Sequence, residues 1–309
     1  MREGPIVILG VFVADTAYRA PRQPRLGETV LGERFTLGPG GKGSNQAVAA
    51  ARAGGRVHFI TRLGTDAFAD LALSTWGEAG VVPEVERSPE SYTGAAFIFL
   101  ESGTGQNAVL IAPGAAGLIS EEDIDGKADL IRGASVFVTQ LEQPIPAAIR
   151  ALQVAREAGV TTILNPAPAA PLPDGTLALC DWVTPNESEA EGLTGIAVAD
   201  PQTAEAAARA LVARGAGGVV VTLGGQGALL LHEGAATHLP ALKAGEVVDT
   251  TGAGDAFNGG FAVALSEGRP PVEAVRFGIA LAGLSVTRPG TAPSMPGREE
   301  IEALLSRGA

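Results

Sequence analysis

Apolar residues in this chain occur in short continuous runs that are separated by longer stretches of helical periodicity. Residues 6–13 form the first run, and a run of this kind is typical of a central strand buried on both faces. Later runs at 135–139, 160–164 and 218–223 each follow a helical pattern. This alternation predicts a three-layer α/β/α fold with a mostly parallel central sheet and helices on both faces.

Two excursions depart from this alternation. Residues 16–37 carry short strand patterns at 29–31 and 34–37, and strand patterns at 81–85, 94–100 and 107–112 follow one another with turns and no helix between them. We expect these excursions to form a small sheet that projects from the main domain as a lid over the site. The exposed edges of such a sheet are suited to cover by a partner subunit.

These patterns divide the chain into two parts. The α/β domain comprises residues 1–13, 38–90 and 113–309, and the β lid comprises residues 14–37 and 91–112. We expect the lid to be the interface of a homodimer.

A glycine-rich stretch near the C-terminus precedes another helical pattern. Val247 and Val248 predict a strand end, and after Asp255 apolar residues recur at helical spacing. Residues 252–254 therefore lie at a helix N-terminus, where the first backbone N–H groups have no intrahelical partner and the macrodipole favours an anion. Small residues allow a phosphate to approach such a backbone closely.

Asp255 follows this stretch directly and places a carboxylate beside the expected phosphate. Such a group orients a hydroxyl nucleophile and accepts its proton during phosphoryl transfer. For an isolated Gly-x-Gly-Asp, the commoner explanation is an aspartate that stabilises an ordinary helix start. The polar residues at the ends of the other strands favour the catalytic interpretation.

Ligands of open α/β sheets bind beyond the carboxyl ends of the strands, and polar residues gather at these positions. Asp15 ends the first run, Glu142, Asn186 and Glu189 follow later strand patterns, and Thr222 lies near the end of the run at 218–223. Singly, each is more often a cap or turn residue. Together they predict one site along this edge of the sheet.

A second glycine-rich loop, at residues 38–46, comes before an alanine-rich helix that Ser44 is suited to cap. Its glycines satisfy G-x-G-x-x-G, but the loop does not follow the first strand, and Asp66 is a loose match for the ribose-binding acid of a dinucleotide fold. Gly43 separates Lys42 from Ser44, so the loop is not a Walker A motif. What remains is a loop that presents backbone N–H groups, Lys42 and Asn45 to a ligand rich in hydroxyl groups.

Oxygen atoms are better candidates for metal binding here than nitrogen or sulfur. His58, His232 and His238 are widely separated and lack the spacing of metal ligands. Glu189 is suited to position Mg²⁺ through water, because magnesium keeps several waters when it is bound to a nucleotide. Asp249, with free carbonyls of the proline-containing segment 285–294, predicts an oxygen cage for a hard cation.

Composition narrows the classes of function. The chain has 309 residues with 46% hydrophobic residues and a net charge of −12, which argues against a general nucleic-acid or anionic-membrane binder. No apolar run approaches the ~20 residues that cross a bilayer, and the N-terminus has no signal-peptide pattern. One cysteine, Cys180, excludes an intrachain disulfide and makes the cytoplasm the simplest location.

Four segments, in order along the whole chain, carry a resemblance. They are residues 40–47 (GGKGSNQA), 165–168 (NPAP), 184–191 (TPNESEAE) and 249–257 (DTTGAGDAF). The chain resembles the ribokinase (PfkB) family of carbohydrate kinases. The resemblance implies Mg²⁺-ATP-dependent phosphorylation of the primary hydroxyl of a sugar, with D-ribose giving ribose 5-phosphate as the first expectation, and potassium as an activator.

The resemblance also implies roles for individual residues. Asp255 is the base, and the N–H groups of Gly252, Ala253 and Gly254 form the anion hole. The sugar pocket is lined by Asp15, Gly41, Lys42, Asn45, Glu142 and Asp255. The nucleotide and magnesium side comprises Asn186, Glu189, Thr222, Gly224, Gly227 and Gly254. The monovalent-cation site comprises Asp249, Thr251, Ser285, Arg288, Gly290 and Ser294.

One position departs from the family pattern. The family typically carries asparagine two residues before the sugar-binding aspartate, and this chain has Val13 there. A buried hydroxyl left unpaired against valine costs about 1–3 kcal/mol, so 2-deoxyribose, fructose or another ketose is an alternative substrate. Further alternatives are a nucleoside kinase, a nicotinamide dehydrogenase suggested by the glycine pattern, and a non-catalytic sugar sensor.

Overall fold

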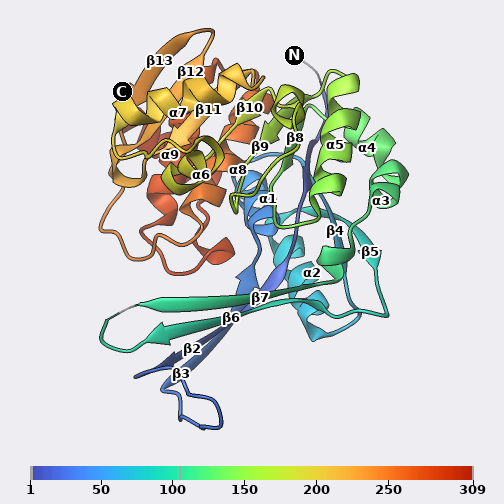
Figure 1. Cartoon of the computed structure of the whole chain (residues 1–309), viewed down its shortest axis with the longest axis vertical. Coiled ribbons are helices and arrows are strands. Elements are labelled where there is room, and N and C mark those ends of the chain that lie inside the picture. Colours follow the sequence, from blue (N-terminus) through green and yellow to red (C-terminus); the bar gives the residue numbers. More distant parts are fainter. Residues whose placement is uncertain (1–2, 105, 308–309) are drawn as a thin grey trace.

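The computed structural model describes residues 3–104 and 106–307, and it contains a large sheet and a small one (Figure 1). In sheet order, the large sheet consists of β13 (Ala235–Leu239), β12 (Ala228–His232), β11 (Gly218–Thr222), β10 (Trp182–Val183), β9 (Thr161–Leu164), β8 (Val136–Thr139), β1 (Ile6–Leu9), β4 (Val57–Leu63) and β5 (Val82–Arg87). The small sheet consists of β3 (Arg34–Gly40), β2 (Val13–Ala20), β6 (Thr93–Glu101) and β7 (Asn107–Gly114).

Helices connect these strands. They are α1 (Lys42–Arg52), α2 (Ala67–Ala79), α3 (Glu121–Gly126), α4 (Ala128–Arg132), α5 (Ile145–Glu157), α6 (Glu187–Thr194), α7 (Pro201–Ala213), α8 (Ala253–Ser266), α9 (Pro271–Ser285) and α10 (Arg298–Arg307). Single turns of 3₁₀-helix lie at η1 (Ala115–Leu118), η2 (Thr176–Leu179), η3 (Gly224–Gln226) and η4 (Ala292–Ser294).

β1 shows how the layers arise from alternation. It pairs in parallel with β4 and β8, and because successive side chains of a strand point to opposite faces, it contributes to two cores. Ile6 and Ile8 pack in the cluster that contains residues of α1, α8 and α9. Val7 and Leu9 pack in the cluster that contains residues of α5 and α7. The predicted three-layer α/β/α fold is confirmed.

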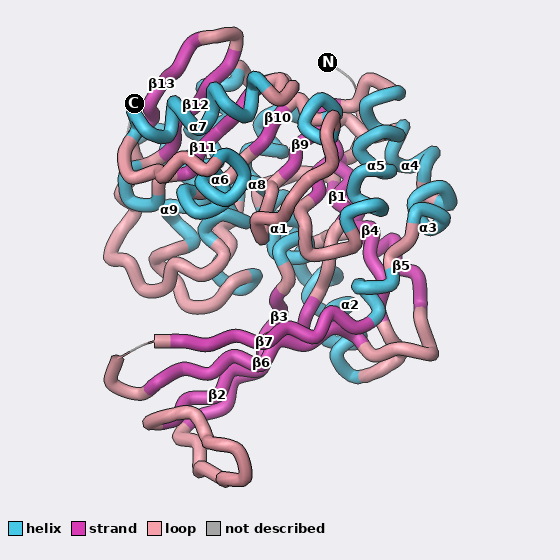
Figure 2. The backbone as a smooth tube through the Cα atoms, in the orientation of Figure 1, coloured by secondary structure: helices cyan, strands magenta, loops and turns pink. Residues whose placement is uncertain are grey.

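The small sheet projects from the main body, at the bottom of Figures 1 and 2. It is formed by segments that are far apart in sequence, because β2 pairs in parallel with β6 and antiparallel with β3. The predicted second sheet is therefore confirmed. The strand pattern at 81–85 becomes β5, which pairs with β4 in the large sheet instead.

The first apolar run is not one strand, as the sequence suggested. β1 ends at Leu9, and β2 begins at Val13 in the other sheet. At the break, a Cβ on Gly10 would lie 2.7 Å from the Cα of Gly43, so the α1 backbone passes too close for any side chain there. Asp15 consequently lies inside β2, not at the end of a central strand.

Helix α1 also begins earlier than predicted. Gly41, with a φ of 88°, is its N-cap, so Ser44 lies in the first turn and is not the cap. The Ser44 hydroxyl instead accepts a hydrogen bond of 2.9 Å from the indole N–H of buried Trp76. The left-handed conformation at residue 41 requires glycine.

Other expectations about elements were wrong. Residues 29–31 are not a strand, and the helix expected at 121–131 divides at Lys127 into α3 and α4. Val247 and Val248 are exposed loop residues rather than a strand end, although the backbone N–H of Val248 donates to Val286 O at 2.8 Å. The antiparallel edge formed by β11, β12 and β13 was not predicted, and the two-residue turn between β12 and β13 places Glu233 and Gly234 at positive φ.

Among the described residues, we find no helix that is both long and apolar enough for a membrane span.

Candidate functional site

The N-terminus of α8 forms one wall of a small cavity. Gly252, with a φ of 78°, caps the helix in a left-handed conformation, and residues 250 and 252–255 line a cavity of about 130 Å³. Ala256 N donates to Gly252 O at 2.8 Å, which is the first regular bond of this helix. The amides before it have no i−4 partner within the helix, so this wall is suited to an anion.

One of the expected anion-hole amides has a local partner. Ala253 N donates to Thr250 O at 3.2 Å, which is a turn bond. This bond must weaken before residues 252–254 can direct all their amides to one phosphate oxygen.

Asp255 lies in the first turn of α8 and is 5% exposed. Both of its oxygens accept hydrogen bonds from α1: Asn45 Nδ2 donates to Oδ2 at 3.0 Å, and Gln46 Nε2 donates to Oδ1 at 3.1 Å. The two glycine-rich signatures, about two hundred residues apart, therefore meet at this carboxylate. Their meeting supports the catalytic interpretation of Asp255 over an ordinary helix start.

Asn45 has an unused acceptor. Its side chain is 4% exposed, and its Oδ1 has no hydrogen-bond partner among the residues that the structure describes. An unpaired buried carbonyl costs about 1–3 kcal/mol. It is therefore suited to accept a hydrogen bond from a ligand hydroxyl group.

The opposite wall is formed by residues at the carboxyl ends of parallel strands. They are Asn165 after β9, Thr184, Asn186 and Glu189 after β10, and Thr222 at the end of β11. A parallel bridge joins Asn186 to Thr222. The predicted edge of the sheet is thus the one that faces α8.

Lys42 and Glu142 connect α1 to the segment after β8. The Lys42 backbone N–H donates to Glu142 Oε2 at 2.8 Å, and Lys42 also lines the cavity. Asp15 reaches the same region from β2, where a Cβ on Gly40 would lie 2.3 Å from its carboxylate. Glycine at position 40 therefore keeps space for the Asp15 side chain.

Burial and like charge raise the pKa values of the acids in this region. Burial, and next the charge of Asp255, raise the pKa of Asp15 to about 6. Burial raises the pKa of Glu142 to about 7, although the N–H and charge of Lys42 oppose it. Burial also raises the pKa of Asp255 despite Lys42 and the two amides. Such displaced carboxyl groups are a common property of catalytic sites.

Lys42 supplies the positive charge in this cluster. Its pKa is raised first by the charge of Asp255, against the effect of burial, and further by Glu142 and Glu189. We therefore expect it to stay protonated throughout the neutral range, where it offsets the repulsion between the carboxylates.

Val13 precedes Asp15 by two residues on β2, so both side chains lie on the same face of the small sheet. Val13 is buried, in the core cluster that includes Ala96 and Ile60. The residue at this position therefore presents methyl groups where the family pattern has an amide.

Two predicted nucleotide-binding glycines do not line the cavity. Gly224 and Gly227 lie in and after η3, beyond β11. A Cβ on Gly227 would lie 2.1 Å from Leu239 O, and its φ is 95°. The hairpin backbone therefore requires glycine at position 227, independently of any ligand.

Glu189 is held by a reciprocal cap. Asn186 N donates to Glu189 Oε2 at 2.9 Å, and Glu189 N donates to Asn186 Oδ1 at 2.8 Å. Within residues 3–104 and 106–307, no cluster of three or more His, Cys, Asp or Glu residues is arranged to hold a metal ion. The cap holds the Glu189 carboxylate in one place. A single carboxylate of this kind fits hydrated magnesium, which keeps several waters and needs few protein ligands.

Asp249 brings together the two halves of the predicted monovalent-cation site. Its carboxylate accepts backbone hydrogen bonds of 2.9 Å from Thr251 and from Gly290. Arg288 pairs with Glu300, so its guanidinium has a partner outside this site. The hydroxyls of Ser285 and Ser294 donate to backbone carbonyls within their own turns. A hydroxyl that donates its proton keeps its oxygen lone pairs, so these two residues could offer a cation either the hydroxyl or the backbone carbonyl oxygen.

Several buried polar residues near Asp255 were not among the predicted site residues, namely Gln46, Gln140, Thr184 and Asn258. Asn165 was noted only as part of a motif. A detectable signal was the position of Gln46 directly after Asn45 in the first glycine-rich signature. For Asn258, the signal was its place one helical turn after Asp255.

A larger hollow of about 470 Å³ lies at the amino ends of β9 and β10, and its lining includes Arg156, Asp181, Trp182 and His232. Arg156 and Asp181 form an ion pair, and Trp182 stacks on His232 with ring centroids 4.9 Å apart. These four side chains thus have partners within the protein. The smaller cavity, where several acids and helix N–H groups converge, is the stronger candidate for chemistry.

Comparisons with known proteins identify the family of the chain. Residues 6–298 match the family described as pfkB family carbohydrate kinase. The chain is 38% identical to a ribokinase of Haemophilus influenzae, over 97% of this chain and 98% of that protein. It is 37% identical to a deoxyribokinase of Salmonella typhi, over 97% and 98%. A structure described as Arabidopsis thaliana ribokinase complexed with ribose and ATP superposes with a TM-score of 0.92 at 34% identity, covering 99% of both chains.

Proposed function

This chain belongs to the pfkB family of carbohydrate kinases, and we propose that it transfers the γ-phosphoryl group of ATP to the primary hydroxyl of D-ribose. The products are ribose 5-phosphate and ADP. The observation that carries the proposal is the position of Asp255, which is buried in the first turn of α8 between the helix N–H groups and the Asn45 amide.

In this proposal, each wall of the cavity takes part in the reaction. Asp255 takes the proton of the sugar hydroxyl as that oxygen bonds to the γ-phosphorus and the bond to the β-phosphate oxygen breaks. The first amides of α8 and Lys42 stabilise the negative charge on the transferring group. Asp15, Asn45 and Glu142 hold the other sugar hydroxyls, for which Asn45 Oδ1 is the open acceptor.

ATP binds along Asn186, Thr222 and the turn with Gly224 and Gly227 in this proposal. The Arabidopsis thaliana ribokinase, at 34% identity, is described as complexed with ribose and ATP, which supports a nucleotide site in this chain. Glu189 would position Mg²⁺ through water, and the bound ion would supply positive charge to the phosphates.

Val13 favours a second candidate substrate, 2-deoxyribose. A buried valine beside Asp15 gives a sugar hydroxyl no hydrogen-bond partner, and a sugar that lacks one hydroxyl avoids that loss. The relatives at 37–38% identity include both ribokinases and deoxyribokinases. The sugar pocket, not the catalytic end of α8, thus decides between the two.

The test is ADP release with Mg²⁺-ATP across D-ribose, 2-deoxyribose, D-fructose, other pentoses and ketoses, and adenosine. Preference for ribose supports the first candidate, and preference for 2-deoxyribose supports the second. Preference for adenosine would identify a nucleoside kinase. Sugar binding without turnover would identify a sensor, and binding of a nicotinamide cofactor would favour a dehydrogenase.

Val13→Asn sharpens the choice of sugar. The variant should raise kcat/KM for ribose relative to 2-deoxyribose by about tenfold, the effect of one buried hydrogen bond. A matched control is Val11→Ala, because Val11 is also buried but lies outside the pocket. This variant should leave the ratio unchanged. An unchanged ratio in Val13→Asn would refute the role of this position.

Potassium is proposed as an activator at the site formed by Asp249, Thr251 and backbone carbonyls of residues 285–294. Asp249 joins these two loops, and Gly252 of the anion hole packs against Thr291 in the second loop. Turnover in potassium should exceed turnover in a larger organic cation at equal ionic strength. Equal rates would remove potassium from the proposal.

The small sheet is proposed as both a lid and the interface of a homodimer, with the domain boundaries predicted from the sequence. One face of it carries exposed apolar side chains, namely Tyr18, Phe35, Leu37, Phe97 and Leu110. The ring centroid of Tyr18 lies 5.1 Å from that of Phe35 and 5.5 Å from that of Phe97, so the patch is continuous.

Sedimentation should show a dimer that Phe35→Glu converts to a monomer, and a monomeric wild type would refute the interface. A cytoplasmic location stays a prediction.

A further inference from the structure

A chain of buried polar side chains leads from Asp255 across the ends of two strands and back to α8. Its members are Gln46 in α1, Asn165 after β9, Thr184 after β10 and Asn258 in α8, each at most 5% exposed. Gln46 Nε2 donates to Asp255 Oδ1 at 3.1 Å and to Asn165 Oδ1 at 3.0 Å. Thr184 Oγ1 donates to Asn258 Oδ1 at 2.6 Å.

Two backbone carbonyls, Thr184 O and Gly254 O, determine which side chain donates and which accepts in each of these hydrogen bonds. Asn165 Nδ2 donates to Thr184 O at 2.9 Å, and a carbonyl can only accept, so Asn165 Oδ1 must face Gln46. Gln46 must then present its NH₂ group to Asn165. At the far end, Asn258 Nδ2 donates to Gly254 O at 2.8 Å, which leaves Asn258 Oδ1 to accept from Thr184.

A second neighbour fixes Gln46 in the same orientation. Gln140 Nε2 donates to Gln46 Oε1 at 2.6 Å. The carbonyl of Gln46 is therefore occupied, and its two N–H bonds are divided between Asn165 and Asp255. A flip of the Gln46 amide would place its oxygen against the oxygens of both neighbours and is excluded.

We infer that Gln46 is a positioning residue for the phosphoryl-transfer reaction, which orients the Asp255 carboxylate and keeps it ready to accept the proton of the sugar hydroxyl. This inference rests on the proposed kinase function. Gln46 contacts Asp255 directly and supports its carboxylate from α1. The hydrogen-bond network connects Gln46 to α8, the helix whose N-terminus forms the anion hole. The base and the anion hole are thereby held in one rigid arrangement.

The charged groups that face Asp255 make this N–H bond important. Asp15, Glu142 and Glu189 interact unfavourably with the Asp255 charge, and Lys42 opposes them. Hydrogen bonds that an ionised carboxylate accepts favour the ionised form. Asn45 and Gln46 supply such bonds to its two oxygens, and loss of one should make the base harder to ionise.

The experiment compares kcat and its pH dependence in wild type, Gln46→Met, Gln46→Glu and Gln143→Met. Gln46→Met removes the donor, and the nearly isosteric Gln46→Glu preserves volume while it removes the fixed NH₂ group. Gln143 is a matched control, since it is a buried amide that bonds Thr139 and Gln140 O without a contact to Asp255. Thermal unfolding and sugar affinity are measured for every variant.

Both Gln46 variants should lower kcat by about 10- to 100-fold, the effect of a hydrogen bond to a charged group. The acid limb of the kcat profile should move up by about one pH unit, with sugar affinity changed less than kcat. Gln143→Met should keep the wild-type profile. An unchanged acid limb in a folded Gln46 variant, or the same displacement in Gln143→Met, would overturn the inference. A wild type without turnover would instead refute the proposed kinase function.

Discussion

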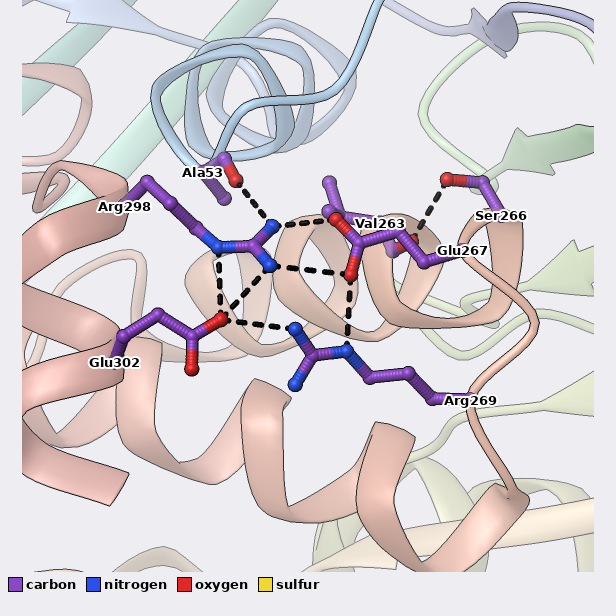
Figure 3. Close-up of polar contacts among 7 residues, drawn as sticks. All are labelled: Ala53, Val263, Ser266, Glu267, Arg269, Arg298 and Glu302. Atoms are coloured by element: carbon purple, nitrogen blue, oxygen red, sulfur yellow. Dashed lines mark hydrogen bonds and ion pairs between the residues drawn. The ribbon is translucent and has the colours of Figure 1, made fainter. Parts of the chain in front are cut away.

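Two clusters of charged side chains in this protein have opposite electrostatic designs. Around the α8 N-terminus, Asp255, Glu142 and Glu189 share the positive charge of Lys42, and Asp15 adds a further acid that interacts with Glu142 and Asp255. At the C-terminal end of the same helix, Glu267 and Glu302 alternate with Arg269 and Arg298 (Figure 3). The first cluster is buried, and the second is partly exposed.

The pKa values follow this difference. In the first cluster, burial outweighs the favourable contacts, and the pKa values of the acids are raised. In the second, burial also acts to raise the pKa of Glu267, but the hydrogen bonds and charges of Arg298 and Arg269 outweigh it and the pKa is lowered. Glu302 behaves in the same way. Acids that each meet a guanidinium stabilise the fold, whereas acids that share a cation gain reactivity at the expense of stability.

The second cluster also has an apolar support. The guanidinium carbons of Arg269 and Arg298 lie 4.7 and 5.0 Å from the centroid of the Phe277 ring, and Arg298 Nη1 donates to Ala53 O at 3.1 Å. These contacts connect α10 to α9 and to the end of α1. The cluster therefore fastens the C-terminal helix to the core.

The largest expected effect is on catalysis at the first cluster. Asp255→Asn keeps the shape of the side chain but removes the proton acceptor, so kcat should fall by about 10²–10⁴-fold. Calorimetric binding of the sugar should persist, because the α1 contacts remain. Wild-type turnover by this variant would mean that another group is the base.

Removal of a charge from the first cluster should stabilise the protein. The folded pKa of Glu142 is about 7 against an ordinary value of 4.5, so between these pH values the folded state binds more protons and its stability falls as pH rises. Glu142→Gln should raise the free energy of unfolding of the ligand-free protein at pH 8 by as much as about 3 kcal/mol. Below about pH 4 the gain should vanish.

Glu267→Gln is the matched control for Glu142→Gln. Its lowered pKa gives stability that is present above the unfolded pKa and is lost as pH falls through the folded one. This variant should therefore lose stability at pH 8, by about 1 kcal/mol. The comparison fails if the two substitutions change stability in the same direction.

Arg298→Met tests the second cluster from the side of the cation. The variant loses two ion pairs, the bond to Ala53 O and the contact with Phe277, so urea unfolding should show a loss of about 1–2 kcal/mol with kcat unchanged. Arg209→Met, which removes an exposed pair with Glu205, should cost about 0.5 kcal/mol or less. Equal losses in the two variants would show that the network adds nothing beyond its single pairs.

The smallest expected effect is the response to salt. From 0.1 to 1 M NaCl the Debye length falls from about 10 to about 3 Å, so the stability difference between wild type and Arg298→Met should shrink by a few tenths of a kcal/mol. The difference for Glu142→Gln should hold, because buried charges are screened less. Equal salt sensitivity would contradict the contrast in burial.

The sequence by itself determined the layered fold, because continuous apolar runs and helical periodicity are local consequences of burial. It also located Asp255 and the helix start at residues 252–254, since glycines and a first-turn acid have local physical meaning. The resemblance supplied the family. Local patterns were insufficient at the break in the first apolar run, where β1 ends at Leu9, Gly10 lies against the backbone of α1, and Val13 begins β2 in the small sheet.

Only the tertiary structure decided how the site is held. Gln46, Asn165, Thr184 and Asn258 come from separate elements, and no spacing in the chain shows that their amides form one bonded series. The same holds for the two charge clusters: composition gives the acids and bases, but burial and partner choice set the sign of each pKa displacement. Those quantities depend on distances across the fold, which a linear sequence does not contain.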